Sequence, residues 1–141
     1  MKALDLAGHI VQRYLDYDAS LTNVELQRLL YICQVVSLVE DNKPLFEEPV
    51  LARKFGPVVK SVYDVYHYNA GLDLVQAEDY NPFVPVPKFV DDLVDKMFTT
   101  KELRILTNRE SGAWYKTITE GKSVILRADM ISLDKEILEY L

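Results

Sequence analysis

The segment from Val24 to Val39 constrains the fold most, because as a helix it is apolar nearly all round. Apolar side chains occupy one side at Leu26, Leu29, Leu30, Cys33 and Val36 and the other side at Tyr31, Ile32, Val35 and Leu38. A helix of this kind is usually the buried centre of its domain. Thr22 and Glu25 have capping-box spacing and predict its start, and Pro44 prevents its resumption.

Three further stretches carry apolar residues at helical spacing. They lie at residues 3–15, 58–69 and 90–98. Gly56 and Pro57 precede the second stretch, where glycine permits a turn and proline suits a first helical turn. Residues 49–55 are compatible with a short extended segment. The expected fold class is therefore mainly α: a single compact helical domain over residues 1–141, with a short extended segment or small β-hairpin.

The second half of the chain is less strongly patterned. Three prolines within residues 72–87 predict an extended, polyproline-like surface segment. Thr99 and Glu102 repeat the capping-box spacing and predict the start of a short helix. Beyond residue 112 we expect a helix over 113–118, an extended piece over 124–126 and a last helix over 133–141 capped by Ser132.

Composition favours a folded protein of a reducing compartment. Hydrophobic residues make up 49% of the chain and charged residues 27%, which is ordinary for a globular domain. The single cysteine, Cys33, excludes an internal disulfide and is expected to be a buried hydrophobe. The first residues do not read as a signal peptide, and no stretch has the roughly 18 apolar residues of a membrane span. We therefore expect a cytoplasmic protein with no membrane partner.

Residue types that carry catalysis or bind metals are sparse. His9 and His67 are the only histidines and are far apart in sequence, whereas a zinc site needs several converging ligands. Asp91, Asp92 and Asp95 fit the solvated polar face and first turn of a helix better than a pair of catalytic carboxylates. No phosphate-binding glycine loop or nucleophile motif occurs. We expect no enzyme activity, no metal and no cofactor.

A basic and aromatic patch stands out against a net charge of −6. It is the predicted partner-binding site and comprises Arg53, Lys54, Phe55, Tyr63, Tyr66, Tyr68 and Trp114. Aromatic residues with arginine are typical of protein-interface anchors. In principle the same residues could hold a nucleic acid strand, but the acidic remainder favours a protein. Alternatively, Tyr63 and Tyr66 pack in the core, and Trp114 is either core or anchor.

Several sequence pieces, in their order and spacing, resemble the SocA-like Panacea-domain antitoxin family. They are Leu26-Gln27-Arg28-Leu29-Leu30-Tyr31, Pro44-Leu45-Phe46, Lys54-Phe55-Gly56-Pro57-Val58, Val62-Tyr63 and Ala113-Trp114. The resemblance covers most of the chain and is strongest over residues 20–70. It implies a mostly helical, phage-associated or bacterial domain that binds a toxin as a protein. After residue 72 the usual long helix before the tryptophan is replaced by two shorter pieces around Thr99 and Thr100.

The resemblance and the patch together lead to one main functional hypothesis. The protein would neutralise a cognate toxin by steric masking, using the region 53–68 and exposed residues of 72–87. A proteolytic adaptor or a phage-encoded host-interaction protein of the same fold is the alternative. A DNA-binding autoregulator is less favoured, because its best basic stretch, residues 53–60, is short. The sequence leaves a homo-oligomer open.

Overall fold

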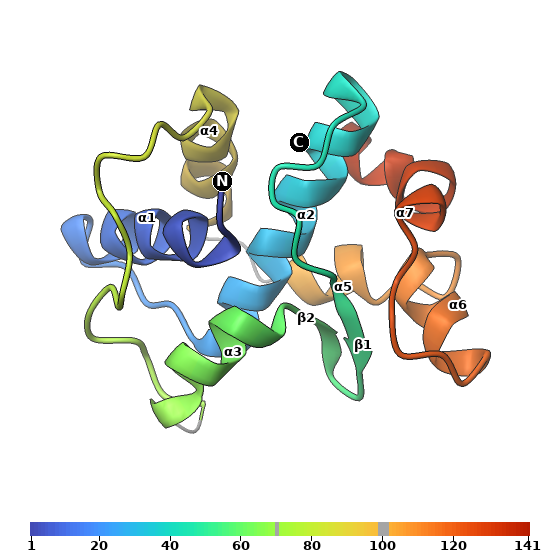
Figure 1. Ribbon diagram of the computed structural model, residues 1–141, viewed down its shortest axis with the longest axis horizontal. Helices are drawn as coiled ribbons and strands as arrows, with labels where there is room; N and C mark the ends of the chain where they lie inside the picture. The colour runs from blue at the N-terminus through green and yellow to red at the C-terminus, as the bar shows by residue number, and fades with distance from the viewer. Residues whose placement is uncertain (70, 99–101) are drawn as a thin grey trace.

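The computed structural model describes residues 1–69, 71–98 and 102–141 and is mainly α-helical, which confirms the expected fold class (Figure 1). These residues form α1 (Ala3–Asp16), α2 (Asn23–Asp41), α3 (Lys60–Tyr66), α4 (Lys88–Met97), α5 (Leu103–Thr107), α6 (Ala113–Thr119) and α7 (Arg127–Asp134). Two 3-10 turns, η1 (His67–Asn69) and η2 (Lys135–Tyr140), follow α3 and α7. The strands β1 (Leu51–Arg53) and β2 (Gly56–Val58) make one antiparallel hairpin.

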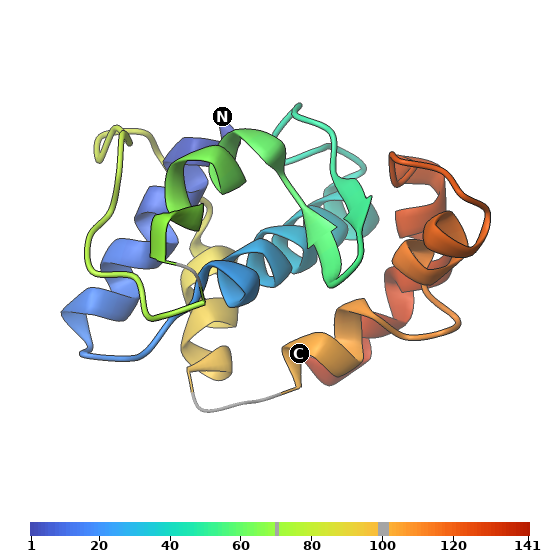
Figure 2. The same ribbon diagram turned by 90° about the horizontal axis from the view of Figure 1, so that it is seen from below.

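Helix α2 is the centre of the molecule, as its sequence predicts. Helices α1, α3 and α4 lie on one side of it and α5, α6 and α7 on the other (Figure 1, Figure 2). Every residue from 29 to 38 is buried. The predicted capping box is confirmed: the Glu25 amide donates to the Thr22 hydroxyl (3.2 Å), and the Thr22 amide donates to the Glu25 carboxylate (2.9 Å).

Two buried glutamines of α2 hold the chain segments that follow it. The amide of Gln34 accepts from the Leu45 backbone (2.7 Å) and donates to the Phe46 carbonyl (2.8 Å). Gln27 accepts from the backbone N–H of Val59 (2.8 Å). Because buried backbone groups need partners, these amides fix the loop before the hairpin and the residue after it. The hairpin is thereby positioned against the first half of α2.

The hairpin is short and is extended by a third piece of chain. Its register pairs Leu51 with Val58, Ala52 with Pro57 and Arg53 with Gly56. Gly56 has φ 144°, a value that favours glycine, and it closes the two-residue turn of Lys54 and Phe55. On the other edge of β1, the amide of Ala52 donates to the Ser123 carbonyl (2.8 Å). The expected extended piece at 124–126 is therefore present only as a single bridge between Leu51 and Val124.

The expectation that Pro57 begins a helix is wrong. Pro57 lies in β2, opposite Ala52, and the helix begins at Lys60 instead of Val58. Proline is tolerated there because β2 is an edge strand and no ladder bond is needed from that nitrogen. Local spacing could not show this, because the pairing with Ala52 decides it.

The predicted start of the last helix, with Ser132 as its cap, is also wrong. Helix α7 begins at Arg127, so Ser132 lies inside it and does not cap a helix. Only the 3-10 turn η2 follows. The predicted cap at Thr99 lies outside the described residues, and α5 begins at Leu103 with no side-chain cap from Glu102. The division into two shorter helices is seen in α4 and α5, while Thr99 and Thr100 themselves lie outside the described ranges.

Residues 72–87 contain no helix or strand, yet the backbone of this segment is held at several points. The amide of Leu74 donates to the Leu21 carbonyl (2.8 Å), and the amide of Asn81 donates to the Asp5 carboxylate (2.8 Å). The Tyr80 ring lies directly over α1 at Gly8, where a Cβ would stand 2.1 Å from the ring. The segment is irregular but docked.

Helices α1 and α4 are joined by charged side chains. His9 lies 2.6 Å from Asp91, and Arg13 forms a two-bonded pair with Asp95 at 2.7 and 2.8 Å. The expected solvated face is seen at Asp92 and Asp95, which are exposed, while Asp91 is partly exposed. Asp91 and Asp95 both sit on the polar side of α4 and carry ion pairs to the neighbouring helix. None of the helices in the described ranges is long and apolar enough to cross a membrane.

Candidate functional site

The tip of the hairpin projects a large apolar side chain from a fixed backbone. Arg53, Lys54 and Phe55 are all exposed, and the Phe55 side chain is 70% exposed. The Phe55 carbonyl accepts hydrogen bonds from Arg28 (2.7 Å) and from the Asn108 amide (3.1 Å). Since both bonds hold the backbone, the ring is presented to solvent in a defined place. The Lys54 ammonium lies 5.5 Å from the ring centroid.

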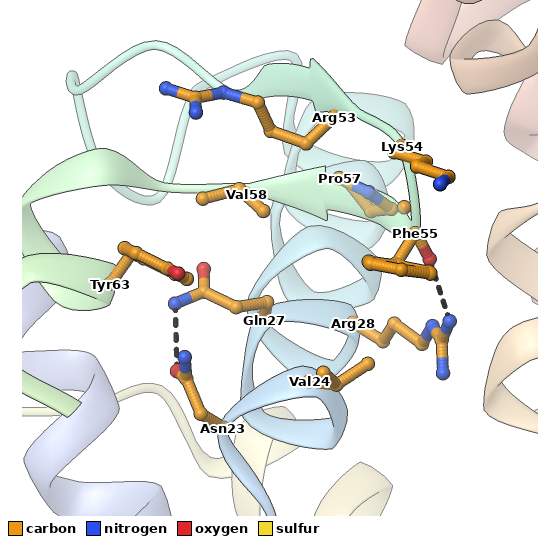
Figure 3. A pocket seen from close by; sticks show the side chains of 11 residues that line it. Asn23, Val24, Gln27, Arg28, Arg53, Lys54, Phe55, Pro57, Val58 and Tyr63 are labelled. Carbon is orange, nitrogen blue, oxygen red and sulfur yellow. Dashed lines mark hydrogen bonds between the residues drawn. The ribbon is translucent and has the colours of Figure 1, made fainter. Parts of the chain in front are cut away.

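A pocket of about 270 Å³ lies between this hairpin and the beginning of α2 (Figure 3). Its wall combines apolar side chains with three cations, Arg28, Arg53 and Lys54, and none of its lining residues is acidic. The lining residues are Asn23, Val24, Gln27, Arg28, Arg53, Lys54, Phe55, Gly56, Pro57, Val58 and Tyr63. In a protein with net charge −6, this is a locally positive hollow.

Arg28 is the site residue that sequence reasoning missed. Its Nε atom is buried and has no hydrogen-bond partner among the described residues. Burial, and next the positive charge of Arg104, lower the pKa of the Arg28 guanidinium. The available signal was a cation inside an otherwise apolar helix, but the sequence does not show that the hairpin covers it.

The two exposed tyrosines of the predicted patch lie beyond the hairpin. Tyr63, on α3, lines the pocket and is 43% exposed. Its ring stacks on His67, with centroids 5.1 Å apart and planes 8° apart. Tyr68 lies in η1 and remains exposed. A protein partner could reach both rings.

The interpretation of Tyr66 as a partner-binding residue needs correction, because its side chain is fully buried. Its hydroxyl accepts from the Glu78 amide (2.7 Å) and donates to the Glu78 carbonyl (3.3 Å). Burial raises the pKa of Tyr66 to about 12. Of the two alternatives for Tyr66, packing in the core and binding a partner, the structure shows the first. Its hydroxyl holds the segment 72–87 in place.

Trp114 is partly buried and supports the hairpin from α6. Its indole N–H donates to the Arg53 carbonyl (2.8 Å), and its ring packs against the core. The tryptophan therefore fixes the backbone of a residue in the predicted patch. Of that patch, the structure brings Arg53, Lys54, Phe55 and Tyr63 around one pocket.

A second cluster, also missed from the sequence, surrounds the fully buried carboxylate of Asp134. This carboxylate accepts from the Tyr31 hydroxyl, from Arg109 (2.7 Å) and from the Ala113 amide (3.4 Å). Burial raises the pKa of Asp134 although these partners oppose the shift. Arg109 also reaches Glu136 at 3.0 Å. Each member of the cluster has partners, and together they join α2, α6 and α7.

A comparison with protein families matches residues 26–139, from α2 to η2, to the family described as "Antitoxin SocA-like, Panacea domain". The chain belongs to this family, as its sequence resemblance predicted. The matched range includes the hairpin, Trp114 and all of the pocket lining except Asn23 and Val24. Neither the curated proteins nor the solved structures yielded a match.

Proposed function

We propose that this protein binds a cognate protein toxin in the cytoplasm and neutralises it by covering the toxin's active region. Membership of an antitoxin family supports an antitoxin-type role. The observation that carries the proposal is Phe55, 70% exposed at the tip of a hairpin whose backbone is held by Arg28 and Asn108. Large aromatic side chains on preorganised backbone are favourable interface anchors, because little entropy is lost when they bind.

The proposed contact is the hairpin surface, which consists of Arg53, Lys54, Phe55 and Tyr63. Tyr68 and Trp114, both at least partly exposed, would flank it. Exposed side chains of residues 72–87, among them Phe83 at 89% exposure, would extend the contact in the family's variable half. The mechanism is steric, so it needs no catalytic group, metal or cofactor from this chain.

The test is co-expression with the product of the adjacent gene. Wild-type protein should relieve growth inhibition and form a stable complex, whereas Phe55→Ala should lose both with an unchanged melting temperature. Tyr140→Ala is the matched control, because Tyr140 is an aromatic residue of similar exposure (63%) in η2. Neutralisation by Phe55→Ala at wild-type level contradicts the proposal. Protease-dependent loss of the toxin would instead favour the adaptor alternative.

A further inference from the structure

The pocket beside the hairpin has an unusual balance of charge. Arg28, Arg53 and Lys54 line it, and none of its lining residues is acidic. Several cations elsewhere in the described structure have carboxylate partners: Arg13 pairs with Asp95, and Arg109 pairs with Asp134. The pocket therefore gathers three cations in a wall that contains no carboxylate.

Arg28 shows this most clearly. Its guanidinium donates to a neutral backbone carbonyl, that of Phe55, and its buried Nε has no partner in the described ranges. The Nε is closed to solvent, so a partner cannot bond to it without rearrangement. A partner could meet the outer nitrogens of the guanidinium, which bond most strongly to a carboxylate.

The remainder of the pocket wall is suited to an apolar group. Val24 lies beside Arg28 and below the ring of Phe55, and Pro57 and Val58 lie along β2 above that ring (Figure 3). At about 270 Å³ the hollow is of a size for one or two side chains. An occupant that satisfies both parts of the wall has a carboxylate next to an apolar side chain.

We propose that this pocket receives an acidic residue and a neighbouring apolar residue from the protein partner. This inference rests on the proposed function and names the chemistry of the toxin segment that the hairpin surface would contact. Charge complementarity of this kind selects partners and sets the register of an interface. A nucleic acid fits less well, because phosphate recognition uses extended basic surfaces, whereas here three cations line a small apolar hollow.

The direct test is an NMR titration of the ¹⁵N-labelled protein with N-acetyl-leucyl-glutamate amide. We expect the amides of Gln27, Arg28, Gly56 and Val58 to shift, with half-saturation in the millimolar range. The neutral N-acetyl-leucyl-glutamine amide should bind at least about tenfold more weakly, since one charge-assisted hydrogen bond is lost. The proposal is overturned if neither peptide shifts these amides up to about 10 mM, if both bind equally, or if a thymidine octanucleotide shifts them more strongly.

Variants separate the pocket from general charge effects. Arg28→Gln and Lys54→Gln should each weaken binding of the glutamate peptide. For Arg28→Gln the dissociation constant should rise by about tenfold or more. Arg127→Gln is the control, because it removes an arginine that pairs with Glu47 outside the pocket, and it should leave the titration unchanged. The Lys54 variant keeps the test valid if Arg28→Gln does not fold.

The partner provides the remaining arm of the test. If the adjacent gene product forms no complex with wild-type protein, the proposed function fails, while the peptide titration still reports on the pocket. If the complex forms but Arg28→Gln and Lys54→Gln bind it with wild-type affinity, the pocket proposal alone fails. The two failures are therefore distinguishable.

Discussion

Arg109 and Arg28 occupy contrasting surroundings in the same small protein. The side chain of Arg109 is only 14% exposed, and it bonds to the buried Asp134, to Glu136 and to backbone carbonyls. Arg28 is half-buried, donates to one backbone carbonyl and keeps a buried Nε without a partner in the described structure. The first arginine joins helices, whereas the second borders an open pocket.

The contrast separates a closed cluster around Asp134, in which buried charges have partners, from a pocket beside Arg28 that is open to solvent. Around Asp134, buried charge is matched by opposite charge and hydrogen bonds, which is the condition for tolerating it in a core. Around Arg28, burial and next the like charge of Arg104 lower the pKa of the guanidinium, and the charge of Glu25 opposes them only in part. We therefore expect substitutions at the closed cluster to affect stability, and substitutions at the open pocket to affect binding.

The largest effect is expected from Asp134→Ala. It leaves the Arg109 guanidinium and the Tyr31 hydroxyl without their buried acceptor, and breaking a buried pair costs about 3–5 kcal/mol. Urea denaturation would measure the free energy of unfolding. Glu136→Ala, at the exposed end of the same arginine, should cost less than about 1 kcal/mol. Equal losses from the two variants would mean that the buried Asp134 stabilises the fold no more than the exposed Glu136.

The docking of residues 72–87 on α1 can be tested by its effect on stability. Gly8→Ala should destabilise the protein by about 1–3 kcal/mol, because the new Cβ would overlap the Tyr80 ring. Alanine otherwise stabilises a helix relative to glycine, so a loss of stability would have to come from the contact with Tyr80. In a Tyr80→Ala background the same change should be neutral or stabilising. In Gly8→Ala, hydrogen exchange should show weaker protection of the backbone amides of Leu74 and Glu78. Unchanged protection would count against docking of the segment on α1.

The third prediction concerns pH. Because burial raises the folded-state pKa of Asp134 above its ordinary value, the unfolded chain loses this proton first as the pH rises. The stability difference between wild type and Asp134→Asn should therefore be greatest below pH 3.8 and decline as pH rises through the folded pKa, with a slope of at most about 1.4 kcal/mol per pH unit. A difference that grows with pH would mean that Arg109 dominates burial.

The smallest effect on stability is expected from Arg28→Leu. The Phe55 carbonyl keeps the hydrogen bond from Asn108, and removal of a partly desolvated cation offsets the lost bond, so stability should change by less than about 1 kcal/mol. Thermal denaturation beside Asp134→Ala gives the measurement. A loss as large as that of Asp134→Ala would place Arg28 in the closed part of the molecule.

Local features of the fold were predictable from the sequence. The central helix and its capping box depend on residues three or four apart, such as Thr22 and Glu25, so their spacing is sufficient to predict both features. Pro57 was misassigned because its conformation depends on pairing with Ala52 across a hairpin turn. Pairing partners are chosen by the tertiary structure, and a helical pattern beside the proline does not reveal them.

The candidate site was predictable in part. Arg53, Lys54, Phe55 and Tyr63 do surround one pocket, since the turn and the following helix keep them close. Tyr66, on the same short helix as Tyr63, proved to be buried, with its hydroxyl bonded to the backbone of Glu78.

The buried cluster could not be foreseen in the same way. Tyr31 and Asp134 are 103 residues apart in the chain, and an aspartate near the C-terminus is ordinarily expected at the surface. Contacts over such separations depend on how the helices pack, which no local pattern encodes.

We propose that the protein acts by presenting a prebuilt surface at the hairpin to a toxin. The most direct test of this proposal is the dissociation constant of the toxin complex for wild type, Phe55→Ala and Tyr140→Ala, measured on variants with equal melting temperatures. We predict that Phe55→Ala weakens binding by about thirtyfold or more, the loss typical of a hot-spot aromatic, while Tyr140→Ala binds as wild type. Equal affinity of all three proteins would mean that the hairpin tip is not the contact with the toxin.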